Sequence, residues 1–269
     1  RGLSSEKNTS LIPVTGLKVY WKFNEASGNI ANSATAVGSA SAVANSDLVV
    51  TGATYGVAGL FGNALSFDGV NDVAITSSAT ITDWNFLNQT GATWSIIMWI
   101  KFDQFTSRFW HISTTNGNGG DTGMSIIGSA TPADRTIDVS IMSAGADDFS
   151  YTSTTPFDNN TTAFQFMAIT YNDATGDLKV KINGNTTETS GGHNLTNTNN
   201  AEQNIRIGEN SDGVLDTAGD YDEYSIWNRV LSEAELVSLY NSGSGLELDS
   251  IPINAVDGSI FYETDTNKS

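Results

Sequence analysis

The sequence predicts an all-β protein, an antiparallel β-sandwich with one short helix near the C-terminal end. Short segments of alternating apolar and polar residues recur about every ten residues, separated by turn sequences such as Asn183-Gly184. Thr, which favours pleated surfaces, and Asn and Gly, which favour turns, are abundant, whereas charged residues make up only 16%. This pattern is typical of a sandwich and not of βαβ units, and a chain of 269 residues can form one such domain.

The first part of the chain is expected to contain four strands. Residues 17–23 alternate with a period of two, so that the odd-numbered side chains, all apolar, face one way. Residues 28–54 are rich in small and polar residues and predict a long surface loop with one short strand at 48–50. The segments 62–67 and 72–75 predict a strand pair joined by a short turn.

Residues 94–102 predict a central strand, because apolar side chains occupy both of its faces. Further strands are expected at 109–113, 123–127, 136–142, 164–171, 177–182 and 204–207.

One helix is expected to begin at Ser232. Its hydroxyl can accept from the amide of Glu235 while the Glu235 carboxylate reaches back to the Ser232 amide, which is a capping box. Leu231 and Leu236 occupy the hydrophobic staple positions, and Gly243 can end the helix.

Composition excludes several classes of protein. With 12 Lys and Arg against 30 Asp and Glu, the net charge is −18 and the pI about 4.1, so a nucleic-acid partner is not expected. The longest apolar run, Ile96–Ile100, is far too short to insert in a membrane, and the absence of Cys excludes disulfides and thiol chemistry. An acidic surface suits an extracellular, virion-surface or cell-surface protein, but it also suits some cytosolic proteins.

Five segments in order resemble a known family: Tyr20–Gly28, Gly62–Asp72, Trp94–Lys101, Phe166–Gly184 and Gly219–Ser232. Together they resemble the laminin-G-like jelly-roll domains of the concanavalin-A-like lectin and glucanase superfamily. The resemblance implies two curved antiparallel sheets packed face to face, with loops clustered along one rim.

The resemblance covers residues 17–243, so residues 1–16 are expected to be a linker and 244–269 a C-terminal extension. Residues 257–269 resemble short segments of phage tail-fibre and other virion-surface proteins, in which the chain continues; the alternative is a floppy terminus. The apolar residues around Phe261 are therefore expected to pack on a neighbouring subunit or module of a larger assembly.

No catalytic constellation is found in the sequence. Sugar-cleaving members of the superfamily carry two carboxylates on one strand, spaced E-x-D-x-x-E or E-x-D-x-E, and no such run occurs here. The nearest cluster, Asp220 to Glu223, has the wrong spacing. Neither His111 nor His193 lies near a nucleophile motif, so we expect no enzyme activity.

Calcium is the expected cofactor, because the turns are dense in the carboxylate and carbonyl oxygens that it prefers. The resemblance implies a structural calcium held by Glu25 and Asp222, with Gly28 as a possible carbonyl donor; a solvated or hydrogen-bonded pair is the alternative. Three further oxygen-bearing residues share one turn, Asp68, Asn71 and Asp72, whose alternative role is an Asx-type turn closing a hairpin.

Candidate ligand contacts lie at strand ends and in loops. Trp84 and Trp110 could stack on a pyranose ring or staple a loop, and the loop 115–122 offers Asn116, Asn118 and Asp121. The remaining four tryptophans are expected in the core: Trp21, Trp94, Trp99 and Trp227.

The sequence therefore favours a non-catalytic recognition or adhesion module, glycan-binding or specific for another surface ligand, in an extracellular or virion-surface protein. The second hypothesis is a structural or decorating domain of a virion, tail fibre or surface layer. The third is a glycoside hydrolase or lyase, which the absent carboxylate pair disfavours.

Overall fold

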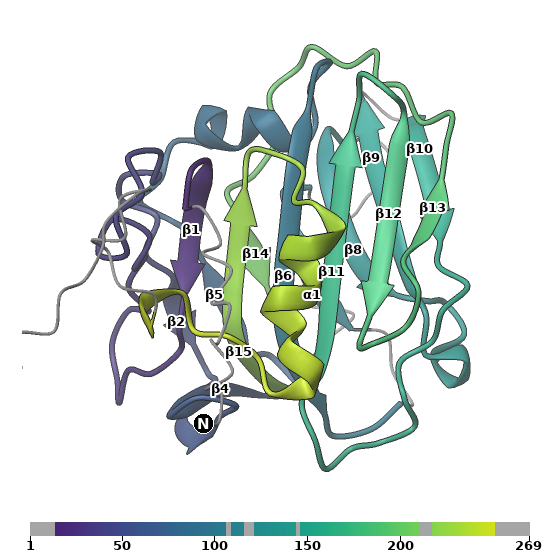
Figure 1. Cartoon of the computed structure of the whole chain (residues 1–269). Helices are drawn as coiled ribbons and strands as arrows, with labels where there is room; N and C mark the ends of the chain where they lie inside the picture. Colours follow the sequence, from purple (N-terminus) through teal and green to yellow (C-terminus); the bar gives the residue numbers. More distant parts are fainter. Residues whose placement is uncertain (1–13, 106–108, 116–120, 144–145, 210–216, 251–269) are drawn as a thin grey trace, which may run out of the picture.

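The computed structural model describes residues 14–105, 109–115, 121–143, 146–209 and 217–250, which form two antiparallel sheets packed face to face (Figure 1). The eight-stranded sheet has the order β13 (Glu188–Ser190), β12 (Asp177–Ile182), β11 (Gln165–Asn172), β6 (Thr93–Phe102), β15 (Ala218–Trp227), β4 (Asn63–Asp68) and β3 (Thr54–Ala58), with β1 (Leu17–Trp21) paired to β15. The seven-stranded sheet has the order β10 (Ala146–Thr152), β9 (Ile137–Ser143), β8 (Gly123–Gly128), β7 (Trp110–Ser113), β14 (Arg206–Ile207), β5 (Val73–Ile75) and β2 (Val49–Thr51). The predicted antiparallel sandwich is confirmed.

The main core lies between the sheets, and β6 and β15 are at its centre. β6 pairs with β11 on one side and β15 on the other, which confirms the central strand expected at 94–102. All ten residues of β15 are buried. The four tryptophans expected to be buried are buried. Trp21 and Trp94 lie in this main core, whereas Trp99 and Trp227 lie in a second cluster on the outer face of the eight-stranded sheet.

Helix α1 (Glu233–Tyr240) covers the outer face of the eight-stranded sheet, where it crosses β6 and β11 (Figure 1). Both halves of the predicted capping box form, because the Ser232 hydroxyl accepts from the Glu235 amide and the Glu235 carboxylate accepts from the Ser232 amide. The helix ends earlier than expected: Asn241, and not Gly243, is the left-handed C-cap. No helix in the described ranges is long and apolar enough to cross a membrane.

A second apolar cluster lies beneath α1. Leu231 and Leu236, the predicted staple pair, are both buried there. Leu17 also belongs to this cluster, although strict alternation would place it with Val19 in the main core. A bulge between Leu17 and Val19 explains the difference, since one irregular residue reverses the face on which the preceding side chain lies.

The two segments expected to pair as a hairpin, β4 and β5, lie in different sheets. β4 pairs with β3 and β15, whereas β5 pairs with β2 and β14, so the turn between them carries the chain from one sheet to the other. Three strands, β3, β10 and β13, are not evident in the sequence pattern. All three lie at sheet edges, where a strand buries fewer side chains and its apolar alternation is weak.

The folded unit continues past Gly243, where the sequence analysis placed its end. Leu248 is only 3% exposed within the cluster beneath α1, and its amide donates to the Tyr20 hydroxyl at 3.2 Å. Lys22 pairs with Glu247 at 3.0 Å and with Asp249 at 2.5 Å. Residues 244–250 therefore pack on the sandwich, while the expected tail strand around Phe261 lies outside the described residues.

Candidate functional site

The first expected calcium ligand, Asp222, has both carboxylate oxygens occupied by backbone amides. Oδ2 accepts from Leu60 at 2.7 Å and from Phe61 at 3.0 Å, and Oδ1 accepts from Glu223 at 2.9 Å. Burial raises the pKa of Asp222 to about 7, against the lowering effect of these amides. The carboxylate thus anchors the 60–61 turn to β15.

The second expected ligand, Glu25, has one oxygen available. Its Oε1 accepts from the amide of Ala31 at 2.9 Å, and its Oε2 is buried and has no hydrogen-bond partner in the described chain. Gly28 lies nearby in the same loop with φ +83°, and its carbonyl accepts from the Tyr55 hydroxyl. Glu25 and Asp222 share no hydrogen-bond partner, and the described residues contain no group of three or more His, Cys, Asp and Glu side chains that could hold a metal ion.

The third oxygen-rich segment is the turn that connects the two sheets. Asp68 Oδ1 accepts from the Val70 amide at 2.9 Å, which is an Asx turn, and Asp72 Oδ2 accepts from the Asp68 amide at 2.7 Å. Asp72 is buried and Asn71 exposed. These bonds form the Asx-type turn that was expected as the alternative to a calcium site. The turn joins two sheets, however, and does not close a hairpin.

Trp84 is a loop anchor and not a sugar platform. It lies in the 3₁₀ helix η1 (Ile81–Leu87), is fully buried, and donates through Nε1 to Asn204 Oδ1 at 2.9 Å. No ring face is exposed to a pyranose, so Trp84 has the second of its two expected roles and fixes a loop. Asp121 is also buried. The side chain of Trp110, and Asn116 and Asn118, lie outside the described residues.

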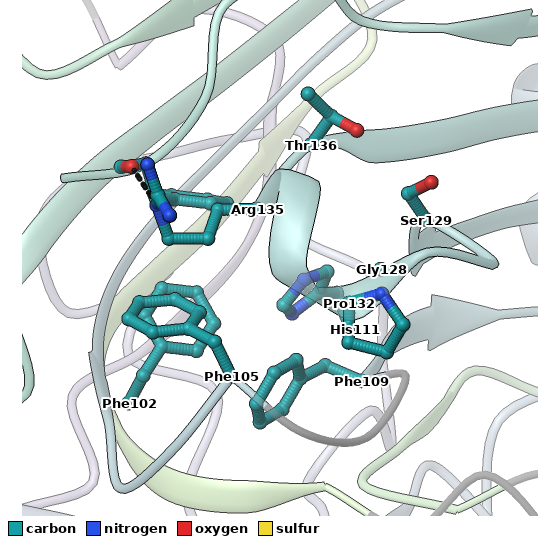
Figure 2. A pocket seen from close by; sticks show the side chains of 10 residues that line it. Phe102, Phe105, Phe109, His111, Gly128, Ser129, Pro132, Arg135 and Thr136 are labelled. Atoms are coloured by element: carbon teal, nitrogen blue, oxygen red, sulfur yellow. Dashed lines mark hydrogen bonds between the residues drawn. The ribbon is translucent and has the colours of Figure 1, made fainter. Parts of the chain in front are cut away.

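An aromatic pocket surrounds His111 between the sheets (Figure 2). Its walls include Phe102, Phe105, Phe109 and Phe157, and the guanidinium of Arg135 lies 5.9 Å from the Phe105 ring centre. The free volume of about 10 Å³ suits one water molecule.

His111 is a buried polar group of this pocket. Its Nδ1 lies 2.7 Å from the Tyr221 hydroxyl, and its fully buried Nε2 has no partner in the described chain. Burial lowers the pKa of His111 to about 3, so the imidazole is neutral near pH 7. The neutral imidazole contributes to packing, and the pocket is too small for a sugar.

An open groove of about 520 Å³ lies between β12, β13 and the N-terminal end of α1. We call it the β12–β13 groove. It is lined by Lys179, Lys181, Gly184, Asn185, Thr186, Thr187, Thr189 and Glu233. Apart from Gly184, all of these residues have polar or charged side chains, and none is aromatic. A ligand in the groove would therefore be held by hydrogen bonds and charge.

Glu233 fixes the shape of the β12–β13 groove. It accepts from Lys181 Nζ at 2.9 Å and from the Thr187 hydroxyl at 2.6 Å. These bonds join α1 to β12 and to the loop between β12 and β13. Partial burial alone would raise the pKa of Glu233, but these hydrogen bonds and the charges of Lys181 and Lys179 outweigh it, and the pKa is lowered. Glu233 is therefore ionised at neutral pH and committed to these partners.

The β12–β13 groove was not expected from the sequence. Its signal is the alternation of Lys179 and Lys181 with apolar residues on β12, which places both lysines on one face. The threonines join them only because β13 pairs Thr189 with Lys179, and Glu233 joins only because α1 packs alongside.

Comparison with known proteins identifies the family. The sequence model described as the concanavalin A-like lectin/glucanases superfamily matches residues 68–237. This is more than half of the chain, which therefore belongs to that superfamily. A search of the curated proteins finds no match.

Solved structures share the fold at low sequence identity. A Trypanosoma rangeli sialidase in complex with sialic acid is 15% identical, with a TM-score of 0.57, and the match covers 86% of this chain and 34% of the sialidase. The botulinum neurotoxin type G receptor-binding domain is 11% identical, with a TM-score of 0.56 and coverage of 84% and 51%. The chain thus spans about a third to a half of these proteins, and the likeness establishes the fold.

Proposed function

We propose that the protein is a non-catalytic carbohydrate-recognition module of an extracellular or particle-surface protein. The observation that carries this is the β12–β13 groove, an open cavity on the outer face of a lectin-type sandwich. The side chains of Asn185, Thr186 and Thr189 line it and have no hydrogen-bond partner in the described chain. Free hydroxyl and amide groups in an open cavity are suited to the hydroxyls of a sugar.

The state of the carboxylates supports recognition over hydrolysis. Most retaining and inverting glycosidases use a free carboxylate pair that flanks the bond to be cleaved. On β15, Asp220 is paired with Lys101 and Asp222 with three backbone amides. In the β12–β13 groove Glu233 is the single carboxylate among the described lining residues.

The proposal is tested on a glycan array together with a reducing-sugar assay on the bound glycans. We expect binding without product release. The double variant Thr186→Val and Thr189→Val should reduce binding, because it removes two hydroxyls while preserving side-chain volume; Thr175→Val, in another exposed turn, is the matched control. No bound glycan, or equal binding by all three proteins, contradicts the proposal, and sugar release supports a hydrolase instead.

We further propose a structural calcium ion at the loop that carries Glu25 and Gly28. The support is the buried Glu25 Oε2 without a partner, since calcium prefers carboxylate and carbonyl oxygens. Saturating calcium at a hundredfold excess over Kd stabilises a fold by about 2.7 kcal/mol. Chelator should therefore lower the melting temperature of the protein and of a control, Asp134→Asn, but not of Glu25→Gln. Identical melting with and without chelator contradicts the proposal.

A further inference from the structure

The two lysines of the β12–β13 groove differ in their partners. Lys181 is 4% exposed, and its Nζ donates to Glu233 at 2.9 Å and to the carbonyl of Asn185 at 2.8 Å. Lys179 is half-buried and has no ion-pair or hydrogen-bond partner in the described part of the chain. One ammonium of the groove is therefore engaged by the protein, and the other is available to a ligand.

The available charge lies inside the groove. The charge of Lys179 contributes to lowering the pKa of Glu233, so the two groups act on each other across the cavity. Lys179, Lys181 and Glu233 give the lining one net positive charge, in a chain whose net charge is −18. Distant acidic residues weigh little here, because salt screens exposed charges beyond about 8 Å at physiological ionic strength.

On the β13 side of the groove, the lining groups next to Lys179 are neutral hydrogen-bonding groups. Thr189 lies directly opposite Lys179 in the β12–β13 ladder, and Asn185 and Thr186 follow at the connection between the strands. An anionic group at Lys179 would thus have hydroxyl and amide partners beside it. A charge-assisted hydrogen bond to the ammonium is about twice as strong as a neutral one, and it discriminates between charged and uncharged ligands.

We infer that the β12–β13 groove selects sugars that bear a carboxylate, with the carboxylate at Lys179 Nζ and ring hydroxyls at Thr186 and Thr189. The inference rests on the proposed function and adds the class of ligand to it. Uronic acids and sialic acids have this chemistry. Their neutral counterparts lack the one group that the free ammonium recognises.

The test is an array of oligosaccharides ending in uronic or sialic acid, each printed beside its carboxyl-reduced form. We expect the acidic form to bind about tenfold more tightly, the ratio that a charge-assisted hydrogen bond supplies. Lys179→Gln should remove this preference. The matched control is Lys18→Gln on β1, because Lys18 also has no ion pair in the described chain and lies across the sheet, 5.7 Å from the Phe86 ring centre.

A second measurement locates the site. Titration with methyl glucuronide should shift the backbone amide NMR signals of residues 185–189 in the wild-type protein and in Lys18→Gln, and far less in Lys179→Gln. Equal binding of acidic and reduced forms, or an acid preference that survives Lys179→Gln, overturns the inference and leaves glycan recognition standing. An array without any bound glycan overturns both. Melting temperatures of the variants verify that each is folded.

Discussion

At the scale of single residues, the least expected feature is a buried acid on β15. Glu223 is 5% exposed and adopts a left-handed conformation, φ +50°, at a bulge where the register with β6 shifts. Its Oε2 accepts from the Tyr20 hydroxyl, and its Oε1 has no partner in the described chain. Burial raises the pKa of Glu223 to about 9, and the charge of Asp222 adds to this. The acid is therefore protonated in the folded protein at neutral pH.

A pH dependence of stability follows from this shift. Between pH 4.5, the ordinary pKa of the side chain, and about 9, the folded protein retains a proton that the unfolded chain has released. The free energy of unfolding then falls as pH rises through this window. The pKa of Asp222 is raised only to about 7, so Asp222 contributes to this fall mainly below pH 7. From pH 7 to 9 Glu223 is the larger contributor of the two.

We expect the free energy of unfolding to fall by about 2 kcal/mol from pH 7 to 9, and Glu223→Gln to make this fall shallower. Denaturant titrations at several pH values measure it. Asp134→Asn, which removes an exposed negative charge, should retain the wild-type slope. A variant slope equal to that of the wild type would disprove the assignment.

At the scale of elements, the segment 244–250 is part of the fold because it completes the apolar cluster beneath α1. Leu248 is buried with Leu236 and Leu239 of the helix. The segment is also tied to β1 through Lys22 and the Tyr20 hydroxyl. Tyr20 thus links three elements, since it donates to Glu223 on β15 and accepts from Leu248.

Leu248→Ala should destabilise the protein by about 2–4 kcal/mol, the usual cost of a cavity in a packed cluster. Val237→Ala, on the same helix at a side chain 51% exposed, should change stability by less than about 0.5 kcal/mol. Truncation after Gly243 should cost at least as much as Leu248→Ala. A truncated protein as stable as the full chain would show that the sandwich is complete at residue 243.

At the scale of the whole molecule, charge opposes folding. Thirty acidic residues against 12 basic ones bring like charges together in the compact state. Several of the lysines and arginines are already engaged in ion pairs, including Lys22, Lys101, Lys181 and Arg229. The remaining acidic surface repels itself, and mobile ions reduce this repulsion.

The melting temperature should therefore rise as NaCl increases from 10 to 500 mM at pH 7, where the Debye length falls from about 30 Å to a few Å. The same series near pH 4.1, where the net charge vanishes, should give a smaller rise, which separates screening from the other effects of salt. A rise of equal size at both pH values would argue against self-repulsion.

Local sequence patterns are sufficient to predict the sandwich, the central strand, four buried tryptophans and the capped helix. These features depend on local alternation, on apolar residues on both faces of one strand, and on a cap between residues three apart, all of which are properties of contiguous segments. The sequence also lacks the paired-carboxylate spacing of the sugar-cleaving relatives.

The roles of individual polar residues depend on contacts between distant segments of the folded chain. Asp222 carries a carboxylate of the kind that binds metal ions, yet its Oδ2 accepts from two amides of a turn about 160 residues away in sequence. Trp84 is an anchor because a distant asparagine and the core enclose it. The β12–β13 groove exists because an edge strand and a helix meet beside two lysines, and side-chain partners across such separations are set by packing, which no local pattern encodes.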